Sequence, residues 1–250
     1  MTPRGQQQEA VMKQFDFLAT QIADTAADSI INRSAENASL ESHLQTLQEQ
    51  LKNLIHAHAP AHAVADARLQ VARTLVGLER GAEAWPIGRA AFDHFIEHDL
   101  FELAADACDV LFQSNQPESI CALGQGIWIA VTCPIDPELT IELLSHVIEE
   151  TPDDADGAAV AATTALFIAD VRARDRQRED LMFFTTQILG TVARRHSGID
   201  TPEQLELWME RLELKEPEKF LVRLRNVVDV LVQDDWWFDR HALQERLPFA

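Results

Sequence analysis

The sequence lacks several features that would place a protein in a functional class at once. Its 250 residues contain no tyrosine and only three cysteines. No apolar run approaches the roughly 18 residues that are needed to cross a bilayer. The first residues are polar and contain no apolar segment of the signal-peptide type. We therefore expect no membrane partner.

The cysteines are isolated from one another. Cys108, Cys121 and Cys133 form no CxxC pair, and an odd number of cysteines cannot close completely into disulfides within one chain. Free thiols are typical of proteins in a reducing compartment. The sequence therefore predicts buried thiols and a cytoplasmic location.

Positive charge is scarce in the middle of the chain. The net charge is −20, and the stretch between Arg89 and Arg172 holds 16 acidic residues but no lysine or arginine. A body of this kind repels phosphate backbones and anionic lipids, so the charge argues against nucleic-acid binding. A requirement for solubility alone accounts for such a composition. The more specific alternative is that the acidic stretch binds a basic protein surface.

What the sequence does contain is a succession of helix signals. Apolar residues recur at helical spacing, and the strict alternation that marks strands is almost absent. Five times an acid directly follows a proline, an arrangement that presets φ in the first helical turn and places negative charge at the positive end of the helix dipole. These prolines are Pro117, Pro137, Pro152, Pro202 and Pro217. Thr201 and Gln204 add a capping box.

Two short segments need a separate interpretation. Residues 127–133 have the composition of a strand, but we expect the end of a buried helix because no other strand is available to pair with them. Gly124 and Gly126 lack the preceding strand and the third glycine of a nucleotide-binding fingerprint. Close packing of helices is the better explanation for these glycines.

Segment lengths of about 12–20 residues with links of 2–6 predict antiparallel helical hairpins. We expect an all-α protein in which the hairpins stack into a short solenoid or bundle. Residues 1–60 would form an N-terminal amphipathic helical segment and residues 61–250 the helical-hairpin domain. A heptad seam in the first segment can pack on the hairpins or on a second copy, and it favours a homo-oligomer (dimer). The seam consists of Leu40, Leu44, Leu47, Leu51 and Leu54.

This architecture resembles that of tetratricopeptide-like helical-repeat proteins. Ala91 and Phe95 match the A-x3-F step of that family, whereas the tyrosine of the repeat consensus is absent. The resemblance implies a scaffold that binds other proteins. It assigns no binding residues in this chain.

His94, Glu97 and His98 form an HxxEH motif. On a helix, two histidines four residues apart share one face and can bind Zn²⁺, with the glutamate acting as base. Such an enzyme also needs a third protein ligand, which the sequence does not identify. Phe92 and Phe95 make the opposite, buried stripe, so we interpret the motif as the polar face of an amphipathic helix. We expect no metal and no cofactor.

Two charged clusters are candidates for binding. Acids concentrate around one turn between helices, where we expect contact with a positively charged protein surface: Glu149, Glu150, Asp153, Asp154 and Asp156. Arginines concentrate where one helix ends and the next begins, and they form a possible anion site because arginine binds phosphate and carboxylate well: Arg172, Arg174, Arg176 and Arg178.

Trp236, Trp237 and Phe238 lie between a helix that runs from about residue 217 to 233 and a short C-terminal helix over residues 239–247. Stacked hairpins leave an apolar end that a terminal element must cover. We therefore interpret the aromatic residues as part of a seal over the core rather than as an exposed binding hot spot.

Together these features predict a non-catalytic adaptor that assembles other proteins through an acidic helical surface. A metal-dependent hydrolase that uses the face of His94, Glu97 and His98 is the first alternative. A self-assembling structural protein, driven by the N-terminal helices, is the second.

Overall fold

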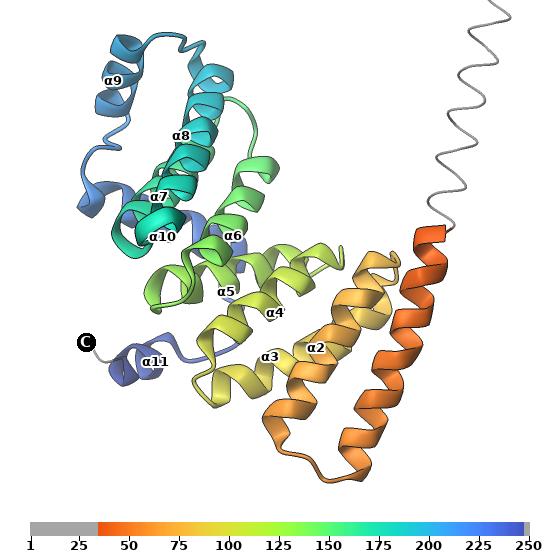
Figure 1. Cartoon of the computed structure of the whole chain (residues 1–250). Helices are drawn as coiled ribbons and strands as arrows, with labels where there is room; N and C mark the ends of the chain where they lie inside the picture. Colours follow the sequence, from red (N-terminus) through yellow and green to blue (C-terminus); the bar gives the residue numbers. More distant parts are fainter. Residues whose placement is uncertain (1–34, 248–250) are drawn as a thin grey trace, which may run out of the picture.

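The computed structural model describes residues 35–247, and within that range the regular structure is entirely helical (Figure 1). A first helix covers residues 35–56. It is followed by α2 (Ala61–Gly77), α3 (Gly81–Glu97), α4 (Phe101–Gln113), α5 (Ser119–Thr132), α6 (Pro137–Glu150), α7 (Asp156–Arg172), α8 (Asp175–Ser197), α9 (Pro202–Arg211), α10 (Pro217–Val232) and α11 (Arg240–Arg246). The predicted all-α class is confirmed.

Consecutive helices pack as hairpins, and the hairpins stack side by side. The pairs are α2 with α3, α4 with α5, and α6 with α7, and α8 packs on α7. Contacts of α2 with α4, α4 with α6 and α6 with α8 define a first row of helices. The second row consists of α3, α5 and α7. The predicted stack of antiparallel hairpins is therefore present.

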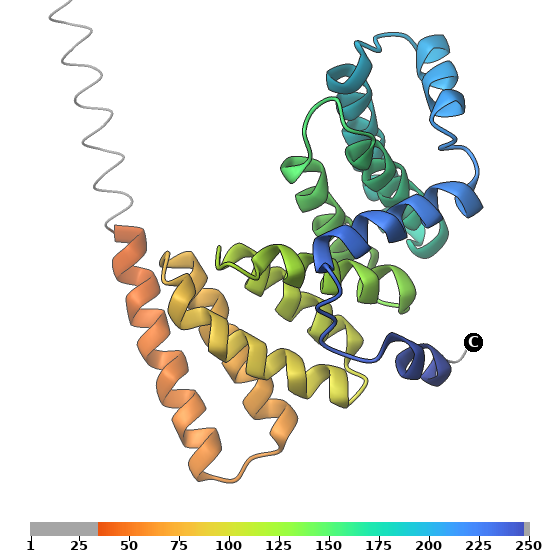
Figure 2. The same ribbon diagram turned by 180° about the vertical axis from the view of Figure 1, so that it is seen from behind.

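The heptad seam has a partner within its own chain. Leu44 is 2% exposed, and Leu47 and Leu51 pack against the same core. The side chain of Leu40 lies beside Gly77 of α2, and helix 35–56 runs alongside α2 in both views (Figures 1 and 2). Self-association stays a prediction, and Leu44, Leu47 and Leu51 of this seam are already packed within the chain. The remainder of the proposed N-terminal segment lies outside the described residues.

Three of the five predicted helix starts are confirmed. Helices α6, α9 and α10 begin at the prolines, and both hydrogen bonds of the Thr201–Gln204 capping box are present. In contrast, α5 begins at Ser119 and α7 at Asp156. Proline followed by an acid also suits a turn, and Ala155 N–H closes such a turn on the carbonyl of Pro152.

Helix α5 lies at the centre of the stack, and its two glycines allow close helix contacts. A Cβ added to Gly124 would lie 2.6 Å from Val232 of α10, and one added to Gly126 would lie 2.7 Å from Cys108 of α4. Residues 122–130 are all buried. Both predictions for this region, a buried helix and close packing at the glycines, are confirmed.

The chain returns along the second row after α9 (Figure 2). Helix α10 packs on α5 and α7, and the aromatic link, residues 236–238, extends the contact to α3. The Trp237 ring lies 5.2 Å from that of Phe92, and the Arg89 guanidinium lies 4.2 Å from the Trp237 ring centre. The aromatic link therefore covers the side of the stack, where we had expected it to cover an end.

A buried amide fixes the aromatic link in place. Gln125 of α5 is fully buried, and its side-chain N–H donates to the carbonyl of Asp235 at 2.8 Å. Its side-chain oxygen accepts from Trp237 N–H at 3.4 Å. The backbone then enters α11 through Asp239, whose carboxylate accepts from His241 and Ala242 N–H.

Replacing Trp237 by alanine should lower the free energy of unfolding by about 2–5 kcal/mol, because a large aromatic ring leaves a packed site. Chemical denaturation of the full chain measures the change. Phe183→Ala is the matched control, since Phe183 is 70% exposed. An equal loss for both variants would contradict the role of the aromatic link.

Candidate functional site: a cleft between α6 and α8

The predicted acidic cluster surrounds the turn between α6 and α7, and all five acids are exposed: Glu149, Glu150, Asp153, Asp154 and Asp156. Two of them have partners within the chain. Asp156 contacts Arg223 at 2.7 Å, and Asp153 lies 3.7 Å from Arg195. Among the described residues, Glu149, Glu150 and Asp154 form no ion pair. The negative charge available to a partner is therefore concentrated on these three acids.

An open cleft adjoins this turn. It lies between α6 and α8 and has a volume of about 380 Å³. Its lining is mainly apolar and includes Ile148, Phe184, Ile188 and Val192, together with the charged side chains of Glu149 and Arg195. Phe184 is 52% exposed although it lines the cleft. Sequence reasoning missed this site because each helix alone shows only an amphipathic stripe.

Three glutamates share one face of α6, and one of them, Glu149, lines the cleft. Glu138, Glu142 and Glu149 lie on one face of that helix, since residues four and seven positions apart share a face. Burial, followed by the charge of Asp109, raises the pKa of Glu142. The cleft thus combines a mainly apolar lining with one carboxylate, that of Glu149, and one guanidinium, that of Arg195.

An aspartate–histidine pair joins two first-row helices, α4 and α6. Asp109 of α4 is 1% exposed, and its carboxylate lies 2.8 Å from His146 Nε2 of α6. Gln113 donates a second hydrogen bond to Asp109 at 2.6 Å, and the His146 ring lies 4.7 Å from that of Phe112. The hydrogen bond to Asp109 raises the pKa of His146.

The four arginines of the predicted anion site contact acceptors of their own chain. Arg172 donates to the carbonyls of Ala130 and Val131, both at 2.6 Å, at the end of α5. Arg174 donates to carbonyls at the end of α7, Arg176 lies 3.7 Å from Asp180, and Arg178 pairs with Asp170. Arg172 is thus engaged in ending a helix, and the anion site stays a prediction.

The HxxEH residues lie at the end of α3. Phe92, Phe95 and Ile96 form the buried stripe, as predicted. His94 is half-buried rather than fully on the outer face, and its ring lies 4.1 Å from that of His98. Burial lowers the pKa of His94. Residues 35–247 contain no group of three or more histidine, cysteine, aspartate or glutamate side chains placed to bind a metal ion.

The cysteines are unsuited to nucleophilic chemistry at neutral pH. Cys108 and Cys133 are buried, and Cys121 is half-buried. Burial raises the pKa of Cys133 to about 12 and that of Cys108 also upward. A thiol becomes a strong nucleophile only as the thiolate, so these residues contribute packing.

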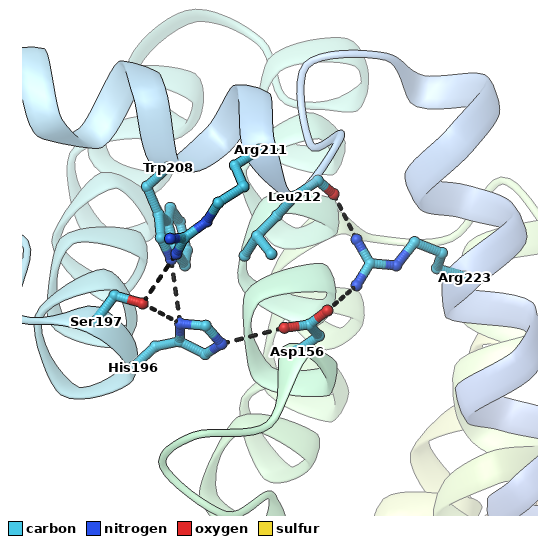
Figure 3. Close-up of polar contacts among 7 residues, drawn as sticks. All are labelled: Asp156, His196, Ser197, Trp208, Arg211, Leu212 and Arg223. Carbon is cyan, nitrogen blue, oxygen red and sulfur yellow. Dashed lines mark hydrogen bonds and ion pairs between the residues drawn. The ribbon is translucent and has the colours of Figure 1, made fainter.

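A polar network joins α7, α8, α9 and α10 on the other side of the acidic turn (Figure 3). Asp156 lies 3.1 Å from His196 Nε2, and His196 Nδ1 lies 2.6 Å from the Ser197 hydroxyl and 3.2 Å from Trp208 Nε1. Trp208 is 2% exposed. Sequence reasoning missed this network because its acid lies 40 residues from its histidine.

No protein-family model, no curated protein and no solved structure matches the chain. The class of protein is therefore defined by architecture: an all-α stack in which consecutive helices pack on their neighbours. In the part of the chain from residue 35 to 247, none of the helices has the length and apolar content needed to cross a bilayer.

The His146–Asp109 pair should make stability depend on pH. A raised pKa means that the pair stabilises the fold fully below the unfolded histidine value of 6.5, and this contribution is lost as pH rises through the folded value. The stability difference between the native protein and His146→Gln should shrink as pH rises from about 6 to about 9.

Denaturant titrations across this range measure the difference, with His43→Gln as the variant that removes an exposed histidine from helix 35–56. A difference for His146→Gln that grows with pH, or a trend identical to the control, would contradict the assignment.

Proposed function

We propose that the protein is a protein–protein interaction adaptor, in which the cleft between α6 and α8 binds a basic segment of a partner protein. The observation that carries this proposal is the position of the cleft. Its apolar lining, with Phe184 half-exposed, lies beside Glu149, Glu150 and Asp154, which have no ion-pair partner among the described residues.

The architecture supports a scaffold role. The hairpins begin at residues 61, 101 and 137, and α8 begins at residue 175, so the spacing is close to that of helical-repeat proteins, for which tetratricopeptide units have about 34 residues. Stacked repeats of this kind commonly present an extended binding surface along one row of helices. Here the cleft and its one acidic lining residue, Glu149, both belong to the first row.

The chemistry of the cleft determines the partner. An apolar side chain can fill the space between Ile148 and Phe184, where it displaces water from a largely apolar lining. Lysine or arginine residues of the same segment then approach the carboxylates at the edge. Such charges accelerate encounter, and this effect weakens as salt shortens the screening length to about 8 Å at physiological ionic strength.

Binding of a labelled, amphipathic lysine–leucine peptide tests the proposal. We expect the substitutions Glu149→Lys, Glu150→Lys and Asp154→Lys together to weaken binding at least about tenfold, which corresponds to about 1.4 kcal/mol. Phe184→Ala should weaken binding through loss of the apolar contact. Fluorescence anisotropy at several salt concentrations measures both effects, and the triple variant should show the flatter salt dependence.

The matched control changes the net charge equally but elsewhere. Glu203, Glu210 and Glu245 are exposed acids on α9 and α11, and their joint replacement by lysine should leave affinity close to that of the native chain. Equal weakening in the two triple variants would show that the peptide senses only overall charge. Unaltered binding by Phe184→Ala would show that the apolar contact in the cleft does not contribute.

A further inference from the structure

Three residues of the polar network have the connectivity of a nucleophile, its base and an orienting acid (Figure 3). The Ser197 hydroxyl lies 2.6 Å from His196 Nδ1, and His196 Nε2 lies 3.1 Å from the Asp156 carboxylate. These distances fall within hydrogen-bonding reach, which is the geometry that activates a serine hydroxyl. The network is separate from the cleft between α6 and α8.

The tryptophan fixes the position of the histidine proton. The indole N–H of Trp208 can only donate, and it points at His196 Nδ1 from 3.2 Å. Nδ1 must therefore carry a lone pair, and the ring proton lies on Nε2, where it is donated to Asp156. In this tautomer the Ser197 hydroxyl and the Trp208 N–H share the one lone pair of Nδ1, and the hydroxyl makes the shorter contact. His196 is thus placed to accept the serine proton, and the indole N–H loses its acceptor when it does so.

The surroundings of the histidine hold this arrangement in place. The His196 side chain is 9% exposed, and Arg223 binds the second oxygen of Asp156 at 2.7 Å. Arg223 also donates to the carbonyl of Leu212, at the end of α9. A buried ring with both nitrogens engaged has little freedom to rotate, which is what a general base requires.

Ser197 opens onto a space of its own. It is exposed, and it lines a pocket of about 280 Å³ together with Gln204, Leu207 and Arg211. Arg211 donates to the Ser197 hydroxyl oxygen at 3.3 Å. Its guanidinium is therefore close to the serine oxygen, and hence to the substrate carbonyl oxygen on which negative charge would develop if Ser197 attacked a carbonyl group.

We propose that Ser197 is a nucleophile that cleaves small carboxylic esters, with His196 as base and Asp156 as the residue that orients it. The Ser197 oxygen bonds to the carbonyl carbon while its proton passes to His196 Nδ1. The carbon–oxygen bond to the alcohol then breaks, and Nδ1 returns the proton to the leaving alcohol. Water attacks the acyl-serine by the same route and releases the acid.

We expected a non-catalytic protein because no short stretch of the sequence contains a convincing catalytic motif. That reasoning does not cover a site in which Asp156 of α7 meets His196 and Ser197 of α8. The same contacts also hold α7, α8 and α10 together, so the experiment must distinguish an activated serine from a purely structural network.

Labelling of the full chain with a fluorophosphonate probe tests the proposal, since the probe forms a bond to an activated serine oxygen and releases fluoride. We expect labelling at Ser197, located by peptide mass spectrometry, and hydrolysis of p-nitrophenyl acetate that Ser197→Ala abolishes. His196→Gln should slow labelling by about 100-fold or more, the usual contribution of a general base.

Ser42→Ala is the control, because Ser42 is an exposed serine of helix 35–56 and its loss should change neither rate. If His196→Gln fails to fold, Arg211→Met takes its place, and labelling should again slow because the stabilising charge is lost. Absence of labelling at Ser197 in the folded chain, or equal rates in the native and substituted proteins, would assign the network to structure alone and overturn the proposal.

Discussion

The close approach of three helices at α5 is the constraint on which the rest of the structure depends. Gly124 and Gly126 bring α10 and α4 to distances that no side chain would permit. Because α5 is buried on both sides, the first row can present polar side chains while the second row receives the returning C-terminal segment. The two rows of the stack therefore have different surroundings: α10 and the aromatic link cover the second row, and the first row keeps its acids and the cleft.

The negative charge of the middle of the chain is only partly available at the surface. Asp153 and Asp156 come directly from the acidic turn, yet arginines from α8 and α10 approach them. These arginines follow the acidic stretch in sequence and return to it in space. Local neutralisation on one side of the turn and open carboxylates on the other give the turn two distinct chemical environments.

What the sequence predicted depended on how far apart the interacting residues lie. The start of α6 at Pro137 and the capping box of Thr201 and Gln204 depend on residues no more than three positions apart, so their patterns were sufficient. The start of α7 was wrong because Pro152 stabilises a turn as readily as a helix. The cleft and the contact between Asp156 and His196 require knowledge of which helices are neighbours, and amphipathic periodicity specifies a buried face without naming the helix that covers it.

The path of the C-terminal segment has a consequence for how the chain is synthesised. Trp237 completes the surroundings of Phe92, a residue made far earlier. In a simple linear array each hairpin needs only its neighbours, so folding can keep pace with the ribosome from the first hairpin onward. Here the outer side of α3 stays uncovered until the aromatic link, residues 236–238, has been made. The first hairpins therefore keep apolar surface exposed until α10 and the aromatic link pack on the second row.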